Sequence, residues 1–392
     1  MKLEQQHIDM IKERFAKMQT KADFIKLLND TKEILYGDDA KPISPKVLYF
    51  FADYRNGQKR YKQFSIRKKS GGQRSINAPK KGLKTIQKVL NVVIQCVFEP
   101  HTAATGFVTN KSVVDNAKAH TGKNYVYNID LKDFFPSIEI HRVKACFKNP
   151  PFNLKDDREP LAFLIANLCC TELDVERKIE GEWKTVKRSV LPQGAPTSPT
   201  ITNIVSQSLD KRLTNLVASF GAIYTRYADD ITFSSDHSIY QKNGKFLNKL
   251  QEIIKQNNFT INEKKVRLQK NGHKQEVTGI TVNEKPNVSQ RYVKQIRMWL
   301  YYWETYGYEK AEKIFRRDYI SDKGYIKSHS AKLVNVLDGK LLYLKMVKGE
   351  NDKTYIKLRD RFIHLISENS LLNNLLDIWE NEGVEKAIDV FN

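Results

Sequence analysis

Cysteine, long apolar runs and acidic residues are all scarce in this sequence. Four of the 392 residues are cysteine and none are spaced as C-x-x-C, so neither a zinc site nor a disulfide framework is indicated. No apolar run approaches the roughly 18 residues of a membrane-spanning helix. The N-terminal stretch is too charged for a signal peptide. We therefore expect a cytoplasmic protein with reduced cysteines.

Basic residues, by contrast, are abundant. Lys and Arg number 66 against 45 Asp and Glu, which gives a formal net charge of +21 that is distributed along the whole chain. Such a dispersed excess indicates a polyanionic partner, most simply nucleic acid. No basic helix with a clean apolar face is apparent, so we expect no membrane partner.

The pattern of apolar residues predicts an α+β fold, because strands and helices are interspersed without a regular β-α-β rhythm. Helical spacing is expected over 1–36, 83–97 and 242–257, and from about 288 onward. A strand is expected at 124–131, and hairpins at 62–79, 177–188 and 222–235.

Two adjacent carboxylates, Asp229 and Asp230, lie in the stretch RYADDITF at 226–233. Strand-forming residues flank them on both sides, which predicts a hairpin with the two carboxylates at its tip. Like charges at that separation repel, and each disfavours ionisation of the other. The pair is either a solvated turn, as we interpret the two other Asp-Asp pairs of the chain, or a metal site that needs a further ligand.

Asp130 is a candidate for that ligand. It lies near the end of a predicted strand, in NIDLKDFFPSI at 128–138, where a lone carboxylate among apolar and aromatic residues is costly to bury. Two strands side by side in one sheet would bring Asp130 and Asp229 together, although they are 99 positions apart. Carboxylates arranged in this way suit Mg²⁺, and two such ions about 3.5–4 Å apart promote nucleotidyl transfer.

The stretches NIDLKDFFPSI, LPQGAPTSP and YADD, in this order, resemble the A, B and C motifs of reverse transcriptases. The resemblance implies a right-hand polymerase with fingers, an antiparallel-sheet palm and a helical thumb. It implies that Asp130, Asp229 and Asp230 are catalytic and hold two Mg²⁺ ions together with the backbone carbonyl of Leu131. We expect an N-terminal helical segment at 1–44, fingers at 45–120 and 148–188, a palm at 121–147 and 189–285, and a thumb and tail at 286–392.

The same resemblance assigns residues to the incoming nucleotide. Phe135 corresponds to the aromatic steric gate against the ribose 2′-hydroxyl, unless it is a core aromatic beside Phe134. Gln193 in LPQG resembles the residue that contacts the nucleotide, and Arg74 the arginine that clamps the triphosphate. The remaining candidates are Lys69, which assists on phosphate or is surface charge, and either Lys264 or Lys265, which acts at the pyrophosphate leaving group or follows backbone phosphate.

Two shorter stretches resemble signatures of bacterial retron reverse transcriptases. DNAKAH contains the N-A-x-x-H pattern with Asn116 and His120, and EVTGITVN contains V-T-G with Val277, Thr278 and Gly279. The resemblance implies that these residues take part in RNA binding. On the residues alone, the first is also compatible with a capped helix and a packed histidine, and the second with a strand ending at a glycine bulge.

The retron resemblance implies specific partners: a cognate structured non-coding RNA, its DNA copy and dNTPs. The enzyme would prime from the 2′-hydroxyl of an internal guanosine and make branched single-stranded DNA (msDNA), in anti-phage defence. No nuclease or protease motif is present, so we expect the effector to be a separate protein. In the basic thumb, Tyr301, Tyr302 and Lys345 are candidates for reading RNA by stacking and phosphate contact, whereas Trp303 is expected in the core.

Two other functions stay open from the sequence. One is another bacterial reverse transcriptase, of the group II intron or abortive-infection type, with the same carboxylate chemistry on a different RNA. The second is a catalytically silent RNA-binding scaffold, although such a protein has no chemical use for Asp130, Gln193, Asp229 and Asp230 together.

Overall fold

The computed structural model describes residues 3–53, 56–67, 71–323 and 331–382. It divides into two compact units, Met1–His273 and Lys274–Asn392, which we describe separately. Helices and antiparallel sheets are mixed in the chain, which confirms the α+β expectation. Lys69 lies outside the described residues.

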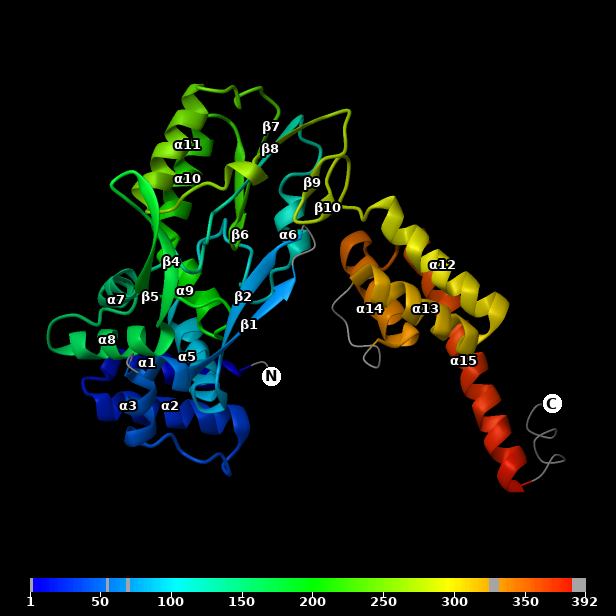
Figure 1. Ribbon diagram of the computed structural model, residues 1–392, viewed down its shortest axis with the longest axis horizontal. Coiled ribbons are helices and arrows are strands. Elements are labelled where there is room, and N and C mark those ends of the chain that lie inside the picture. Colours follow the sequence, from blue (N-terminus) through cyan, green and yellow to red (C-terminus); the bar gives the residue numbers. More distant parts are fainter. Residues whose placement is uncertain (1–2, 54–55, 68–70, 324–330, 383–392) are drawn as a thin grey trace. The chain divides into compact units, whose positions relative to one another are not determined.

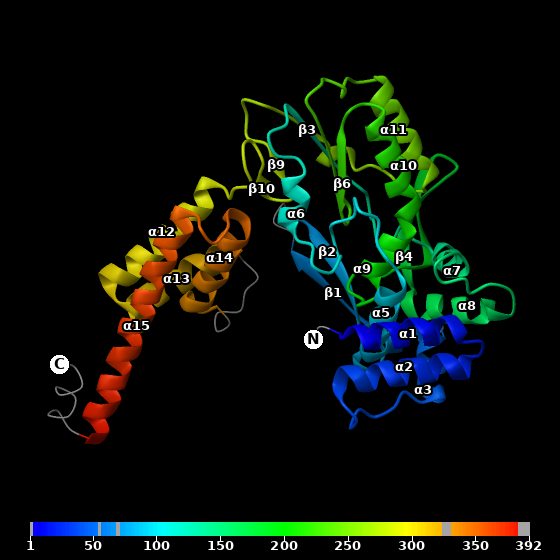
Figure 2. The same cartoon turned by 180° about the vertical axis from the view of Figure 1, so that it is seen from behind.

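Helices form the base of the first unit (Figures 1 and 2). The expected helical stretch at 1–36 is two helices, because Thr20 caps the second one in a capping box with Asp23. Ser44 accepts a hydrogen bond from the Val47 amide and Pro45 follows it, an arrangement typical of a helix start. The elements up to the palm are α1 Gln5–Lys17, α2 Lys21–Tyr36, α3 Pro45–Ala52, α4 Gly57–Arg60, β1 Tyr61–Arg67, β2 Gln73–Pro79, α5 Lys81–Val97 and α6 Val113–Lys118.

The centre of the first unit is a four-stranded antiparallel sheet in the order β6-β7-β3-β8. Helices α10 and α11 lie against one face of this sheet (Figure 1). Alternation along the strands sends Tyr224 and Phe233 to that face, and the rings of Phe233 and Phe246 on α11 are 5.4 Å apart. The strands and covering helices are β3 Tyr125–Asp130, β6 Ile223–Tyr227, β7 Asp230–Ser235, β8 Arg267–Lys270, α10 Gln207–Ala218 and α11 Lys245–Gln256. This sheet is the palm that the motifs predict.

Two long hairpins and several short helices complete the unit. The predicted hairpins appear as β1–β2 and as β4–β5, and the second turns at Glu180 and Gly181, both with positive φ. Arg177 on β4 contacts the loop after β3 by donating to the Pro136 carbonyl at 2.7 Å. The remaining elements are α7 Ile140–Lys148, η2 Asp156–Arg158, α8 Glu159–Cys169, β4 Thr171–Ile179, β5 Glu182–Val190, α9 Ser198–Val205 and η3 Glu263–Lys265.

The second unit is a short hairpin followed by helices packed around aromatic residues. Trp303 is buried as expected, and the rings of Trp299 and Phe315 meet edge-to-face at 5.1 Å. Its elements are β9 Glu276–Val277, β10 Ile280–Thr281, α12 Gln290–Tyr306, α13 Tyr308–Lys323, α14 Leu333–Lys348 and α15 Lys353–Glu382. Across the described parts of both units, no helix combines the length and apolarity that crossing a bilayer requires.

Candidate active site

The palm sheet brings the three predicted carboxylates to one place. Asp130 ends β3 and is directly opposite Asp230, the first residue of β7. Asp229 lies in the turn before β7, and its carbonyl accepts a hydrogen bond from the Leu131 amide at 3.1 Å. Ala228 takes up a left-handed φ of 57°, which makes this turn tight enough to present adjacent carboxylates at the strand end.

These carboxylates hinder one another's ionisation. Burial and the charge of Asp130 raise the pKa of Asp229, and the nearby cations Lys265 and Arg74 only partly oppose this effect. Burial by the surrounding protein, then Asp229 and Asp130, raise the pKa of Asp230 to about 6. A cluster whose members hinder each other's ionisation attracts a cation, which favours the metal-site interpretation over a solvated turn.

Two side chains from the segment before β8 contact Asp130, which is 5% exposed. Asn262 donates to its Oδ1 at 3.1 Å, and the Lys265 ammonium lies 2.6 Å from its Oδ2. The sequence leaves Lys264 and Lys265 as equal candidates; the structure brings Lys265 into contact with Asp130, and the role of either lysine at the leaving group stays a prediction. Asn262 is a contact that the motifs do not indicate.

The donors available here fit Mg²⁺. They are carboxylate oxygens of Asp130, Asp229 and Asp230, together with the backbone carbonyl of Leu131, whose side chain is buried in the core. Among the described residues, no three acidic, histidine or cysteine side chains stand close enough to hold an ion by themselves. That agrees with the usual binding of Mg²⁺, which takes one or two carboxylates and completes its shell with substrate phosphates and water.

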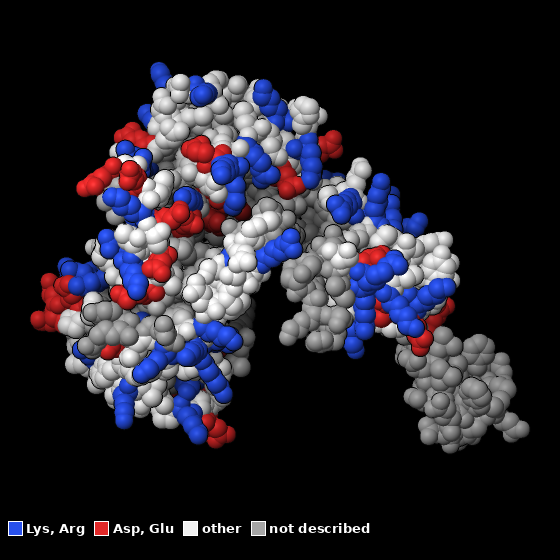
Figure 3. Space-filling model, viewed as in Figure 1, with Lys and Arg blue, Asp and Glu red and all other residues white. Residues whose placement is uncertain are grey.

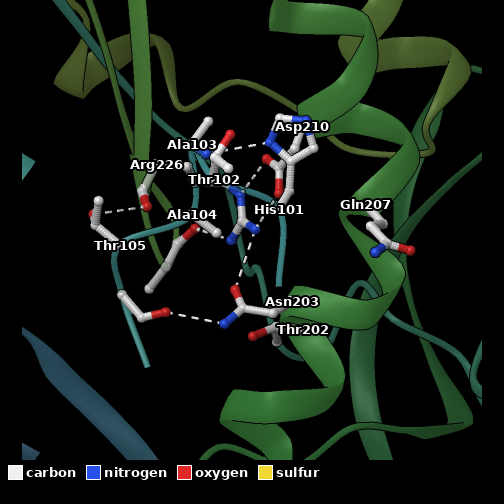
Figure 4. A network of polar contacts seen from close by, with 12 residues as sticks. His101, Thr102, Ala103, Ala104, Thr105, Thr202, Asn203, Gln207, Asp210 and Arg226 are labelled. Atoms are coloured by element: carbon white, nitrogen blue, oxygen red, sulfur yellow. Dashed lines mark hydrogen bonds and ion pairs between the residues drawn. The ribbon is translucent and has the colours of Figure 1, made fainter. Parts of the chain in front are cut away.

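A buried ion pair lies behind the turn that carries Asp229 (Figure 4). Arg226, immediately before the Y-A-D-D stretch, is paired with Asp210 on α10 at 2.6 Å, and both side chains are fully buried. Burial alone would lower the pKa of Arg226, but the Asp210 carboxylate outweighs it and raises that pKa. The same guanidinium donates to the Ala228 carbonyl at 3.2 Å and to Asn203 on α9 at 3.1 Å. The turn is therefore held by the Arg226 side chain as well as by its strands.

Comparison with known proteins agrees with this geometry. Residues 66–282 match the family described as reverse transcriptase (RNA-dependent DNA polymerase). The retron Mx65 reverse transcriptase of Myxococcus xanthus is 31% identical over 321 residues, which cover 81% of this chain and 69% of that protein. The retron Ec86 reverse transcriptase of Escherichia coli is 30% identical over 257 residues, covering 64% and 71%.

The chain belongs to the retron reverse transcriptases. It is also 37% identical over 255 residues to the retron Mx162 reverse transcriptase of Myxococcus xanthus. This alignment covers 62% of the chain and about half, 51%, of that relative.

In this retron reverse transcriptase, the fingers hairpin brings Arg74 toward the carboxylates. Arg74 on β2 is close enough to Asp229 to influence its pKa, and its position suits a clamp on phosphates beside a metal site. The LPQG loop is joined to the same strand, since the Asn77 amide donates to the Gln193 carbonyl at 2.8 Å. Gly194, with φ of 119°, passes so close that a Cβ there would lie 2.9 Å from Ile76 Cγ2.

The predicted gate, Phe135, is half-buried beside the core aromatic Phe134, with ring centroids 5.8 Å apart. A second aromatic neighbour of Phe135 is Phe107, with ring centroids 6.3 Å apart, and the motifs do not indicate it. The sequence offers a weak signal for Phe107, a large apolar residue directly after a glycine in a polar stretch.

The prediction that Asn116 and His120 bind RNA is wrong for their side chains, because both are fully buried. His120 bridges two strands of the palm: its Nδ1 lies 2.7 Å from Ser234 Oγ and its Nε2 2.7 Å from Thr225 Oγ1. Asn116 accepts a hydrogen bond from Thr105 at 2.9 Å. The N-A-x-x-H pattern is thus a packing motif on the palm face opposite α10 and α11.

Replacing His120 with Phe should lower the free energy of unfolding by about 2–4 kcal/mol, because two buried hydroxyls lose their partner. Burial lowers the pKa of His120 to about 3, below the ordinary value of about 6.5. The stability from neutral His120 is therefore complete above pH 6.5 and is lost as the pH falls. Urea unfolding should show that the difference in free energy of unfolding between wild type and His120→Phe is smaller at pH 5 than at pH 7.5. His141→Phe, at an exposed histidine, serves as the control. If the difference in free energy of unfolding caused by His120→Phe is the same at both pH values, His120 is not a buried neutral histidine.

The V-T-G signature forms the turn of the β9–β10 hairpin. Val277 is fully buried, so its predicted RNA contact is also wrong for the side chain. Thr278 and Gly279 have φ of 47° and 84°, as a two-residue hairpin turn requires, and for them RNA contact stays a prediction. This hairpin lies in the second unit, beyond His273, whereas the sequence analysis placed it with the palm.

Proposed function

We propose that the chain is an RNA-directed DNA polymerase that copies a cognate structured non-coding RNA into branched single-stranded DNA. The observation that carries this proposal is the meeting of Asp130, Asp229 and Asp230 at one end of the palm sheet, in a chain that belongs to the retron reverse transcriptases. Synthesis would begin at the 2′-hydroxyl of an internal guanosine and consume dNTPs.

In this proposal the residues divide the work among them. Asp130, Asp229, Asp230 and the Leu131 carbonyl would hold two Mg²⁺ ions, which would supply activation of the attacking hydroxyl and charge neutralisation at the leaving pyrophosphate. Arg74 would clamp the triphosphate, and Lys265, whose ammonium lies 2.6 Å from Asp130 Oδ2, would neutralise or protonate the pyrophosphate leaving group. Gln193 and Phe135 contact the sugar and base side of the nucleotide, and Phe135 excludes a 2′-hydroxyl by overlap.

The charge of the surface supports a nucleic-acid partner. Lys and Arg side chains are spread over much of the visible face in Figure 3, as expected from the net charge of +21. In the second unit, Tyr301 is 53% exposed, and the Lys340 ammonium lies 4.4 Å from the Tyr292 ring centre. Exposed aromatics among cations suit stacking and phosphate contact with folded RNA.

The biological setting belongs to the same proposal. We infer a role in anti-phage defence in the bacterial cytoplasm, with a separate effector protein, because retron reverse transcriptases as a family are used in this way. This inference is tested separately from the chemistry, by asking whether deleting the chain alone abolishes protection against phage.

The product distinguishes this proposal from other reverse transcriptases. After expression with the DNA that flanks its coding region, the purified protein should carry RNA joined to DNA through a 2′-5′ linkage. Debranching enzyme should separate the two strands, and alkali should leave DNA with a short ribonucleotide remnant. Linear DNA would indicate a group II intron or abortive-infection type of enzyme, and RNA without DNA would indicate a silent scaffold.

A further inference from the structure

One exposed aromatic residue beside the site adopts a strained backbone conformation. Phe107 has a φ of 61° and is 39% exposed. Bulky residues rarely occupy the left-handed region, and such strain persists only where the surroundings enforce it, commonly at functional sites. Neither the motifs nor the proposed roles above account for this residue.

The backbone before Phe107 is held by the network that holds the Asp229 turn (Figure 4). The Thr105 amide donates to the Arg226 carbonyl at 2.8 Å, and Asn203 Nδ2 donates to the Gly106 carbonyl at 3.0 Å. Gly106 lies against the turn itself, since a Cβ there would be 2.6 Å from the Ala228 amide nitrogen. No side chain fits at 106, so the segment can approach this closely only with glycine.

With its backbone held in this way, the Phe107 ring contacts two residues of the site. Its centroid lies 6.3 Å from that of Phe135, the proposed gate, and 6.3 Å from that of Tyr227, the first residue of Y-A-D-D. Both separations fall within the range of favourable aromatic pairs, about 4.5–7 Å. Phe107 thus links the gate on the loop after β3 to the catalytic turn after β6.

We propose that Phe107 is a positioning residue that holds the Phe135 ring in place and thereby sets the discrimination between deoxy- and ribonucleotides. This inference rests on the proposed polymerase function. On its other side, Phe135 is supported by Phe134, which is anchored in the core against Phe259 at 5.5 Å. Without Phe107 the gate has one aromatic support instead of two, so its ring gains freedom to move away from a 2′-hydroxyl.

Phe107→Gly tests this proposal cleanly, because glycine removes the ring and also accepts the left-handed backbone. Single-nucleotide extension should show the preference for dNTP over rNTP, as a ratio of kcat/KM, falling about tenfold. The fall should come mainly from a higher KM for dNTP and a lower KM for rNTP. Phe107→Tyr, which keeps the ring, should restore a preference near that of wild type.

A double-mutant cycle shows whether Phe107 acts through the gate. Phe135→Ala alone should lower the preference, and adding Phe107→Gly to it should change the ratio by no more than about twofold. Asn110→Gly is the matched control, since Asn110 is an exposed residue of the same loop with φ of 62° and carries no ring. It should leave the ratio unchanged.

The possible failures are distinguishable. If Phe135→Ala lowers the preference but Phe107→Gly does not, the role of Phe107 is refuted while the polymerase function stands. If Phe107→Gly lowers the ratio equally in both backgrounds, it acts independently of Phe135 and the positioning role is overturned. If the wild-type protein extends no primer with any nucleotide, the proposed function itself fails.

Discussion

Asp229→Asn is expected to abolish DNA synthesis, with a fall of about three orders of magnitude or more, while RNA binding persists. Asparagine keeps the shape of the side chain but removes the charge that the proposed Mg²⁺ site requires. The measurement is primer extension on bound RNA with Mg²⁺, alongside RNA affinity by filter binding. RNA contacts depend on the basic surface, so the affinity should stay within about twofold of wild type and weaken with salt in both proteins.

Whether Asp229→Asn folds like wild type can be checked by asking if the substitution raises or lowers the free energy of unfolding. Ionised carboxylates with raised pKa values destabilise the folded state above those values. Without metal, the variant should therefore be at least as stable as wild type at pH 8 and should lose this advantage below about pH 4. Asp236→Asn, just beyond the far end of β7, removes an exposed carboxylate that pairs with Lys123 and should leave synthesis unchanged. If Asp229→Asn makes DNA at a near-native rate, Asp229 is not a metal ligand.

The second large effect is expected at the buried pair beneath the turn. Asp210→Ala leaves the fully buried Arg226 without its carboxylate, and breaking such a pair costs about 3–5 kcal/mol. Tyr224 also loses a partner, since its hydroxyl donates to Asp210 at 2.6 Å. Unfolding in urea should show this loss, and DNA synthesis should fall with it because the Asp229 turn is no longer held.

A double variant separates stability from positioning. Replacing the pair by apolar residues, Asp210→Leu with Arg226→Met, should recover most of the stability, as apolar replacements of buried pairs often do. It should not recover synthesis, because Met cannot donate to the carbonyl of Ala228 or to Asn203. Glu304→Gln, which breaks a half-exposed pair with Arg361 in the second unit, is the control and should cost less than about 1 kcal/mol. A loss no larger than this for Asp210→Ala would contradict the structural role.

Local patterns along the chain predicted the elements that carry the site. Alternating apolar residues predict the strand that ends at Asp130 and the hairpin around Asp229. Both are present, and their strands pair antiparallel. The predicted hairpin at 177–188 is also present, with its turn at Glu180 and Gly181. These features depend on contacts between neighbours in sequence, so the sequence itself displays them.

Other features were misread because they depend on distant partners. The sequence leaves His120 open as an RNA-binding or a packed histidine, and the structure packs it against strands more than a hundred positions away, at Thr225 and Ser234. Lys265 could not be separated from Lys264 until the segment before β8 was placed against Asp130. The spacing of apolar residues shows which face of a helix or strand is buried, but it does not show which residues cover that face.

By itself, the sequence determined the fold class, the reverse-transcriptase resemblance and the choice of carboxylates to propose as catalytic, because ordered motifs and strand periodicity are written in adjacent residues. Only the tertiary structure decided that Asp130 lies opposite Asp230, that Arg226 and Asp210 form a buried pair, and that Phe107 contacts Phe135 and Tyr227. These contacts join segments far apart in the chain, and their energies come from burial and close packing, which exist only once the chain has folded.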